Sequence, residues 1–239
     1  MNTLQYTSLA LLSLVLFITT ACAQKVTGNG NVVEENRPVE PFSALEVGGV
    51  LNVYLSQGDT ESLTVEADEN ILNLIETENR GSTLVVKLKK GVNIKKAERK
   101  NVYITLRSID ELEVGGVVNV KSETPIAIEK LKLDIGGVGN TDLELRGDQL
   151  DIKADMVGNV TLRGEVQEAN IKNGGVGSLN AFDLVVNKLT IKNTGVGSAE
   201  VHAQDEISIT SSGVGSVRYQ GDAVVKELST SGVGKVKKI

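Results

Sequence analysis

The sequence predicts an all-β fold: a right-handed parallel β-helix, or solenoid, of about 19–20-residue repeats. A strand-rich N-terminal cap with one short helix is expected to precede the repeats. The first observation is a glycine-rich phrase, Gly-Val-Gly-Asn/Ser in its fullest form, whose central valine recurs at 50, 117, 138, 157, 176, 196, 214 and 233. The second is the absence of a helical period between these valines, which is typical of a solenoid in which each repeat forms one coil. The third is a content of 25 glycines, which suits a turn-rich β fold.

The amino terminus, residues 1–23, predicts an export signal. Its apolar run from Leu9 to Ile18 is too short to span a bilayer and is followed by small residues. Two processing routes compete: lipidation of Cys22, or cleavage after Ala23. We favour lipidation, because the chain's lone cysteine stands where bacterial lipoproteins carry their acylated one. The expected location is the cell envelope, as an outer-membrane lipoprotein; the alternative is a secreted or periplasmic protein that begins at Gln24.

Residues 26–108 are expected to form the N-terminal cap and to include the first copy of the repeat phrase, within 43–55. Alternating residues at 61–67 predict a strand, and 81–89 and 101–107 predict two more. Between them, Asp68 is expected to cap a short amphipathic helix near 68–78. This segment fills the 67 residues between the first two valines of the repeat phrase and is a candidate to cover the end of a core.

Residues 109–239 align as repeats on the central valine. The position five residues before it is always aliphatic, and the position three residues after it is almost always apolar. Both columns should face the core, because a position that never admits charge marks the inward face of a strand. A third column, three residues before the valine, changes from aliphatic to polar and predicts an internal polar ladder in the last repeats. Its members are Val47, Val114, Ile135, Ala154, Asn173, Asn193, Ser211 and Thr230.

The repeat phrase itself is expected to form a structural corner. Its glycines suit positive φ angles or close approach between repeats, and the following Asn or Ser predicts a second polar column. The valines and glycines together are expected to hold the repeats in place. The corner residues are Gly137, Gly139, Asn140, Gly158, Asn159, Gly175, Gly177, Ser178, Gly195, Gly197, Ser198, Gly213, Gly215 and Ser216.

Several ordered motifs resemble a known bacterial family. They are GNGNVVEENRPV, FSALEVGGVLNVYLSQGD, LTVEADENILNLIETE and LKKGVNI, together with the repeated corners. Together they resemble the family called putative auto-transporter adhesin, head GIN domain, over residues 26–239. The resemblance implies an exported or lipid-anchored β-helical envelope protein and adds no catalytic residue. Where many members carry Gly-Gly-Ser-Asp corners, this chain has neutral Gly-Val-Gly-Asn or Gly-Val-Gly-Ser.

No motif predicts catalysis, a metal or a cofactor. His202 is the sole histidine and is expected to face solvent, and no HExxH or GxSxG motif surrounds it. Residues 136–142 resemble a calcium nonapeptide, but the aspartate comes one place late, so a calcium-stabilised scaffold is an alternative only. A polysaccharide-active enzyme is the other alternative. It would use outward clusters of acids and bases, either Asp142 and Glu144 with Arg146, or Asp151 with Lys153 and Arg163.

Charge is the remaining guide to partners. A net charge of -6 disfavours nucleic acid, and 3% aromatic residues disfavour a sugar-stacking platform. One basic run could contact anionic polysaccharide, lipid headgroups or an acidic protein, or could simply keep the cap soluble. The run consists of Lys87, Lys89, Lys90, Lys95, Lys96, Arg99 and Lys100. The sequence therefore predicts a non-catalytic envelope module, adhesin-like or structural, whose partner is a glycan or another envelope protein, with oligomers possible in principle.

Overall fold

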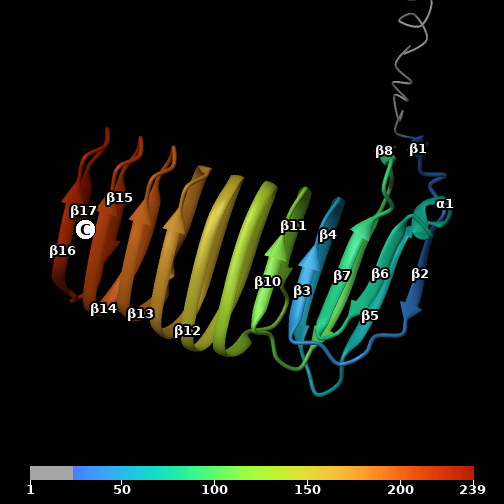
Figure 1. Cartoon of the computed structure of the whole chain (residues 1–239), viewed down its shortest axis with the longest axis horizontal. Coiled ribbons are helices and arrows are strands. Elements are labelled where there is room, and N and C mark those ends of the chain that lie inside the picture. Colours follow the sequence, from blue (N-terminus) through green and yellow to red (C-terminus); the bar gives the residue numbers. More distant parts are fainter. Residues whose placement is uncertain (1–23) are drawn as a thin grey trace, which may run out of the picture.

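The structure is a computed structural model that describes residues 24–239 (Figure 1). The expected export signal and the lipidation of Cys22 therefore lie outside the described residues. A main sheet of 15 strands and a small two-stranded sheet, β1 with β8, make up the fold together with one short helix. The elements are β1 (Gln24–Thr27), β2 (Val32–Arg37), β3 (Ala44–Val47), β4 (Val50–Gln57), β5 (Ser62–Asp68), α1 (Glu69–Leu72), β6 (Ile75–Arg80), β7 (Thr83–Leu88), β8 (Val92–Lys96), β9 (Lys100–Leu106), β10 (Glu111–Val114), β11 (Val117–Ser122), β12 (Ile126–Asn173), β13 (Val176–Asn193), β14 (Ala199–Ser211), β15 (Val217–Gln220), β16 (Val224–Thr230) and β17 (Val236–Lys238).

The predicted fold class, a right-handed parallel β-helix, is wrong. The chain is all-β with one short helix, as expected, but its main sheet is nearly closed, barrel-like and mixed in strand orientation. Strand β5 runs antiparallel to both β2 and β9, and β6 runs antiparallel to β7. The physical reason lies in strands outside the repeat pattern. A tight turn joins β6 to β7, and β5 pairs with β2 and β9, which lie far from it in the chain.

The repeats in the later part of the sheet pair in parallel and in register. Val117 lies beside Val138, and Val157 beside Val176. The row continues from Val176 through Val196 and Val214 to Val233 as isolated parallel bridges. Equivalent residues of successive repeats are therefore direct neighbours, and each column of the sequence alignment is a physical row across the sheet.

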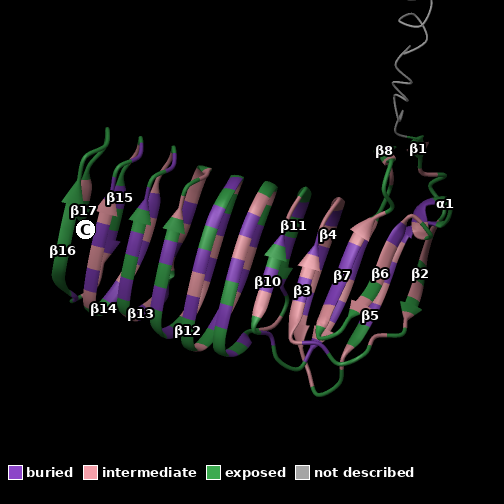
Figure 2. Cartoon of the chain, in the orientation of Figure 1, coloured by how far each residue is buried: buried purple, intermediate pink, exposed green. Residues whose placement is uncertain are grey.

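The two apolar columns form the core, as the alignment predicts. Figure 2 shows buried and exposed residues alternating along the strands, because successive side chains point to opposite faces. The column five residues before the valine is buried from β3 to β14 and contains Leu45, Leu112, Leu133, Ile152, Ile171, Ile191 and Ile209. Its last member, Leu228 on β16, is 54% exposed, since no further described strand covers it.

The third column becomes polar where the sequence predicts it. Asn193 is fully buried and accepts a hydrogen bond of 2.8 Å at Oδ1 from Asn173 Nδ2. Ser211 follows in the next repeat, beside Asn193 in the parallel register, and is also buried. The amide pair satisfies part of the hydrogen-bonding capacity that burial would otherwise leave unmet. Thr230 lies on β16 and is exposed.

The helix is shorter than predicted and lacks the expected cap. Helix α1 spans Glu69–Leu72 only, and Ile75 already begins β6, whose pairing with β7 ends the helix. The side chain of Asp68 makes no capping hydrogen bond. It is buried and accepts hydrogen bonds from the backbone N–H groups of Gly30 (2.9 Å), Glu98 (2.9 Å) and Arg99 (3.1 Å). Asp68 therefore joins the loop before β2 to the loop before β9.

Candidate functional site

The most developed recess across the repeat strands is a groove on their outer face, about 580 Å³ in volume. Its walls come from two outward columns, four and six residues before the central valine, because Leu133, Ile152, Ile171 and Ile191 between them point into the core. We call it the polar groove. Its outward residues are Lys132, Asp134, Asp151, Lys153, Asn170, Lys172, Thr190, Lys192 and Thr210.

Charge changes along the polar groove. At the β10 end, Lys132 Nζ lies 2.6 Å from Glu111 Oε1, and this hydrogen-bonded ion pair raises the lysine pKa. Next along, Lys153 Nζ lies 3.3 Å from Asp155 Oδ2 and 3.4 Å from Asp134 Oδ2, and these two carboxylates raise the lysine pKa in turn. The groove is therefore charge-balanced at this end.

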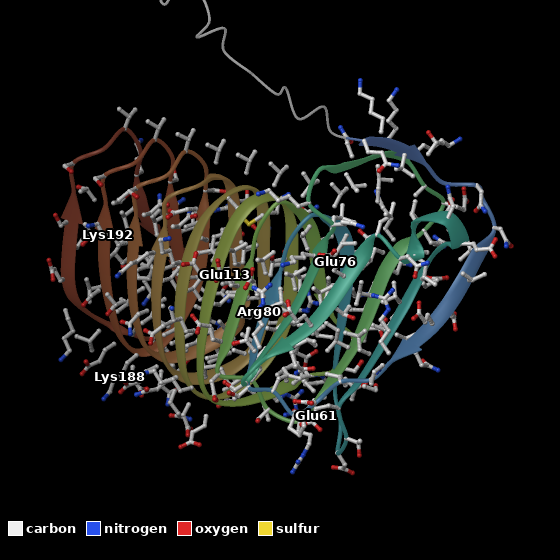
Figure 3. The ribbon with its side chains drawn as sticks, turned by 45° about the vertical axis from the view of Figure 1, so that its right-hand side comes forward. Glu61, Glu76, Arg80, Glu113, Lys188 and Lys192 are labelled. Carbon is white, nitrogen blue, oxygen red and sulfur yellow. The ribbon has the colours of Figure 1, made fainter. Side chains whose placement is uncertain are left out.

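At the other end of the polar groove the lysines lack acidic partners. Within residues 24–239, neither Lys172 nor Lys192 belongs to an ion pair. Figure 3 shows Lys192 on the flank of the repeats, whereas Lys188 of the same strand lies at the lower corner. Thr190 and Thr210 place hydroxyl groups beside these lysines. This end of the groove offers positive charge and hydrogen-bonding groups to a polar, anionic partner.

The acid and base clusters considered for catalysis are assembled only in part, since Arg146 pairs with Glu144 but Asp142 pairs with Arg163. Lys153 pairs with Asp134 and Asp155, as described, while Asp151 accepts a 2.9 Å hydrogen bond from Asn170 Nδ2. The remaining pairs are simple cross-strand or same-strand ion pairs. Arg163 pairs with Asp142 at 2.5 Å, and Arg146 with Glu144 at 3.0 Å.

His202 lies on the outward face, between the buried Val201 and Ala203, as predicted, but it is half-buried. Its Nδ1 lies 3.2 Å from the carbonyl oxygen of Phe182 and 3.2 Å from Gln220 Nε2. The ring is therefore in contact with polar groups of β13 and β15. Across the described part of the chain, no three His, Cys, Asp or Glu side chains group closely enough to hold a metal ion.

An asparagine ladder crosses five neighbouring strand segments. Asn52 Nδ2 donates to Asn101 Oδ1 at 3.0 Å, and Asn119 Nδ2 donates to Asn52 Oδ1 at 3.0 Å. Asn140 and Asn159 extend the ladder with bonds of 3.3 Å and 3.1 Å to the preceding amides. The sequence predicted only the later members of the ladder, the corner residues Asn140 and Asn159. Asn101 belongs to no repeat, and the pairing of β4 with β9 places it beside Asn52.

The corner glycines permit a very close approach between repeats. Gly177 has a φ of 143°, and a Cβ atom there would lie 1.8 Å from the carbonyl oxygen of Gly158. Gly197 and Gly215 have almost the same geometry against the glycine of the preceding repeat. Only glycine avoids both the strained backbone and the overlap at these positions.

The sequence predicts that the central valines and glycines hold the repeats in place, but the valine side chains lie outside the core. From Val117 to Val214 they are 47–52% exposed, and Val233 is 74% exposed. They form an outward apolar row, which we call the valine ridge: Val117, Val138, Val157, Val176, Val196, Val214 and Val233. The physical reason is strand parity, since the buried columns lie at odd distances, five and three residues, from the valine.

The basic run is divided among several elements. Lys89 and Lys90 occupy the turn between β7 and β8, and Lys95 and Lys96 end β8; all four are exposed. Lys87 on β7 and Lys100 on β9 are partly buried, and Arg99 lies 4.0 Å from Glu66. The exposed lysines of the run therefore lie between Lys89 and Lys96. The other three residues are partly buried or lie near an acidic side chain.

No helix within residues 24–239 has the length and apolar character needed to cross a bilayer. No curated protein sequence matches the chain. Solved structures do match it. An adhesin-like protein from Bacteroides fragilis, described as a putative adhesin, shares 28% identity, with a TM-score of 0.86 over 90% of this chain and 100% of that one. A protein from Parabacteroides distasonis described as a putative lipid binding protein shares 21% identity, with a TM-score of 0.70 over the same shares, and supports the fold alone.

A second Parabacteroides distasonis protein, described as a putative adhesin, is 23% identical, with a TM-score of 0.66 over 90% of this chain and 100% of that one. The family model described as putative auto-transporter adhesin, head GIN domain, matches residues 41–223, which is well over half of the chain. The match includes the polar groove, the repeats as far as β15, and most of the segment before them. The chain therefore belongs to the head GIN domain family of putative auto-transporter adhesins.

Proposed function

We propose that this protein is a non-catalytic binding module of the cell envelope, and that the polar groove is its contact surface. The observation that carries the proposal is the unpaired positive end of the groove, where Lys172 and Lys192 project beside Thr190 and Thr210. The strands that hold these side chains are fixed in register on both sides. A rigid array of cations and hydroxyls at strand spacing suits a repetitive, negatively charged partner.

The partner class that fits best is an anionic envelope glycan. Such a chain carries carboxylates or phosphates at regular intervals together with hydroxyl groups, and both can be bound without aromatic stacking. The description of this chain's relatives as adhesins supports a surface-binding role over an enzymatic one. Another envelope protein with an acidic, extended segment would engage the same lysines and is the competing partner.

The glycan hypothesis is tested with an array of acidic and neutral polysaccharides. We expect binding to acidic chains that falls at high salt and falls at least about tenfold in the double variant Lys172→Ser and Lys192→Ser. The matched control is Lys188→Ser, a lysine of the same strand that Figure 3 places at the lower corner, paired with Glu168. Equal losses in both variants, or turnover of a polysaccharide, would contradict the proposal.

We further propose that the protein is an outer-membrane lipoprotein acylated at Cys22. The proposal rests on the position of the lone cysteine after an apolar run and small residues. Mass spectrometry of the mature amino terminus distinguishes the two processing routes. A diacylated or triacylated Cys22 supports anchoring, whereas a free Gln24 supports a secreted or periplasmic form.

A further inference from the structure

The exposed large apolar side chains of the described residues fall into two groups. One is the valine ridge, and the other lies in the last repeat and at the C-terminal residue: Val224, Val225, Leu228 and Ile239. The valine ridge has one valine in each of seven repeats, and its neighbours pair in parallel register from Val117 to Val138 and from Val157 to Val233. Exposed valines cost free energy in water, so a row of seven at one edge of a soluble domain is a feature of contact surfaces.

The edge that carries the ridge is almost free of charge. Within two residues of each ridge valine the chain has glycine, asparagine, serine, threonine, valine or methionine, and the only charged residues are Asp155 and Lys235. The strand faces on the two sides, by contrast, carry charged residues: lysines and aspartates of the polar groove on one side, and ion pairs such as Arg163 with Asp142 and Arg218 with Glu200 on the other. An apolar edge with so few charges, bounded by polar faces, can enter the interfacial region of a bilayer at little cost in buried charge.

The ridge continues into the basic segment. Gly48 N–H donates to the carbonyl oxygen of Val86 at 2.9 Å, and Gly49 packs directly on Leu88. The corner of the first repeat phrase is therefore the neighbour of the turn that carries Lys89 and Lys90. Within residues 24–239, these two lysines take part in no ion pair.

The described chain also begins at this place. Gln24 N–H donates to the carbonyl oxygen of Gly91 at 2.7 Å, so β1 starts beside the same turn. Figure 1 shows β1, β8 and the tips of the repeat corners along one side of the molecule. Cys22, the proposed acylation site, comes two residues before Gln24 in the sequence.

We propose that the valine ridge and the basic turn, Lys89 and Lys90, form one surface that docks on an anionic lipid bilayer. The lysines bind anionic headgroups, and the valines enter the interface along the edge of the repeats. In this orientation the polar groove, on the flank, remains open to solvent and to its partner. The inference rests on the proposed envelope location but not on acylation, because the surface itself supplies both headgroup attraction and apolar contact.

The test uses residues 24–239, which contain the whole described core. Flotation is measured with phosphatidylethanolamine–phosphatidylglycerol vesicles and with phosphatidylcholine vesicles. We expect binding to the anionic vesicles, weaker binding at high salt, and little binding to the neutral ones.

Two sets of variants locate the surface. Val157→Ser, Val176→Ser and Val196→Ser, combined, should reduce vesicle binding at least about tenfold, because three half-exposed apolar side chains are lost from the contact. The matched control, Val224→Ser with Val225→Ser, changes exposed valines outside the ridge and should leave binding unchanged. Lys89→Gln with Lys90→Gln should abolish the preference for anionic vesicles, whereas Lys237→Gln with Lys238→Gln should not. Circular dichroism melting confirms that each variant folds.

The results of these experiments distinguish bilayer docking from self-association and from glycan binding. Absence of vesicle binding by the parent chain, or equal binding by the ridge variant, overturns bilayer docking. A dimer in sedimentation velocity without vesicles, lost in the ridge variant, would also overturn it and would assign the ridge to a second copy of the chain. Glycan binding through Lys172 and Lys192 is measured separately, so its failure leaves the vesicle result intact, and the reverse holds too.

Discussion

The segment before the repeats and the repeats themselves reach the same kind of sheet by different means. Between β1 and β9 parallel and antiparallel pairs both occur, and individual polar contacts such as those of Asp68 join the loops. From β10 onward all pairs are parallel, and most residues lie beside their equivalents in the next repeat, apart from a few register shifts. The stability of the first segment therefore depends on particular side chains. The stability of the repeats depends on having a suitable residue at the same position of every copy.

This difference governs how each region responds to substitution. In the first segment, one side chain serves several backbone groups that lie far apart in the sequence, so its removal affects several loops at once. In the repeats, an unsuitable residue at a column position disturbs the copy on each side of it. Four substitutions test the comparison, in descending order of expected effect.

Gly177→Ala should give the largest loss of stability. The added Cβ meets the Gly158 carbonyl oxygen at 1.8 Å, and a φ of 143° is strained for any residue with a side chain. We expect a loss of about 4 kcal/mol in the free energy of unfolding, measured by urea denaturation. Gly30→Ala is the control, since its φ is 78° but no atom lies within 4 Å of the new Cβ, and it should cost only about 1 kcal/mol. Equal losses of unfolding free energy in the two variants would show that the cost comes from backbone strain and not from the close approach between repeats.

Ile171→Ala should rank second. Ile171 is 2% exposed within the aliphatic column, so its truncation leaves a cavity and should cost about 3 kcal/mol in unfolding free energy. Leu228→Ala is the matched control in the same column. Its side chain is 54% exposed, so the loss should stay below about 1 kcal/mol. Similar losses at both positions would mean that strand β16 is covered in solution.

Asp68→Asn tests the individual contacts of the first segment. Burial opposes ionisation of Asp68, but the backbone N–H groups of Gly30, Arg99 and Glu98 outweigh it and hold the carboxyl pKa below its usual value. Replacing the carboxylate by an amide weakens three charge-assisted hydrogen bonds and should cost about 2 kcal/mol near neutral pH.

The pH dependence of this loss has a defined sign. Because the folded-state pKa of Asp68 is lowered, its contribution is fully present above the unfolded value, near 3.8, and is lost as pH falls through the folded value. Urea denaturation of both proteins at neutral and acidic pH measures the difference, which should shrink in acid. A difference independent of pH would show that the hydrogen bonds do not depend on the carboxylate charge. Asp59→Asn, an exposed carboxylate in a loop, serves as the control.

The polar ladder inside the repeats should show the smallest effect. Asn193→Ala removes the acceptor of Asn173 and should cost about 1 kcal/mol in unfolding free energy. The double variant Asn173→Val with Asn193→Val replaces both partners by apolar groups and should be close to neutral, as thermal melting would show. A double variant that is less stable than the single one would indicate that the amides position neighbouring repeats.

The sequence predicted the repeats and their core better than it predicted the whole sheet. The aliphatic column, from Leu45 to Ile209, and the switch to Asn193 and Ser211 follow from parity and spacing, and the structure buries them. The family assignment also follows from motifs in the sequence. The repeat could not predict the mixed orientation of the sheet. The antiparallel pairing of β5 with β2 and β9 involves segments that occur once and lie outside the repeat pattern.

By itself the sequence determined which residues of each repeat could be buried, because a two-residue period and a constant spacing leave little freedom in a parallel row. Only the tertiary structure decided what lies beside those rows. It placed Asn101 in line with the corner asparagines, divided the basic run, and turned the valines outward. The physical reason is that such neighbours are set by pairing between segments far apart in the chain, and no local pattern records that pairing.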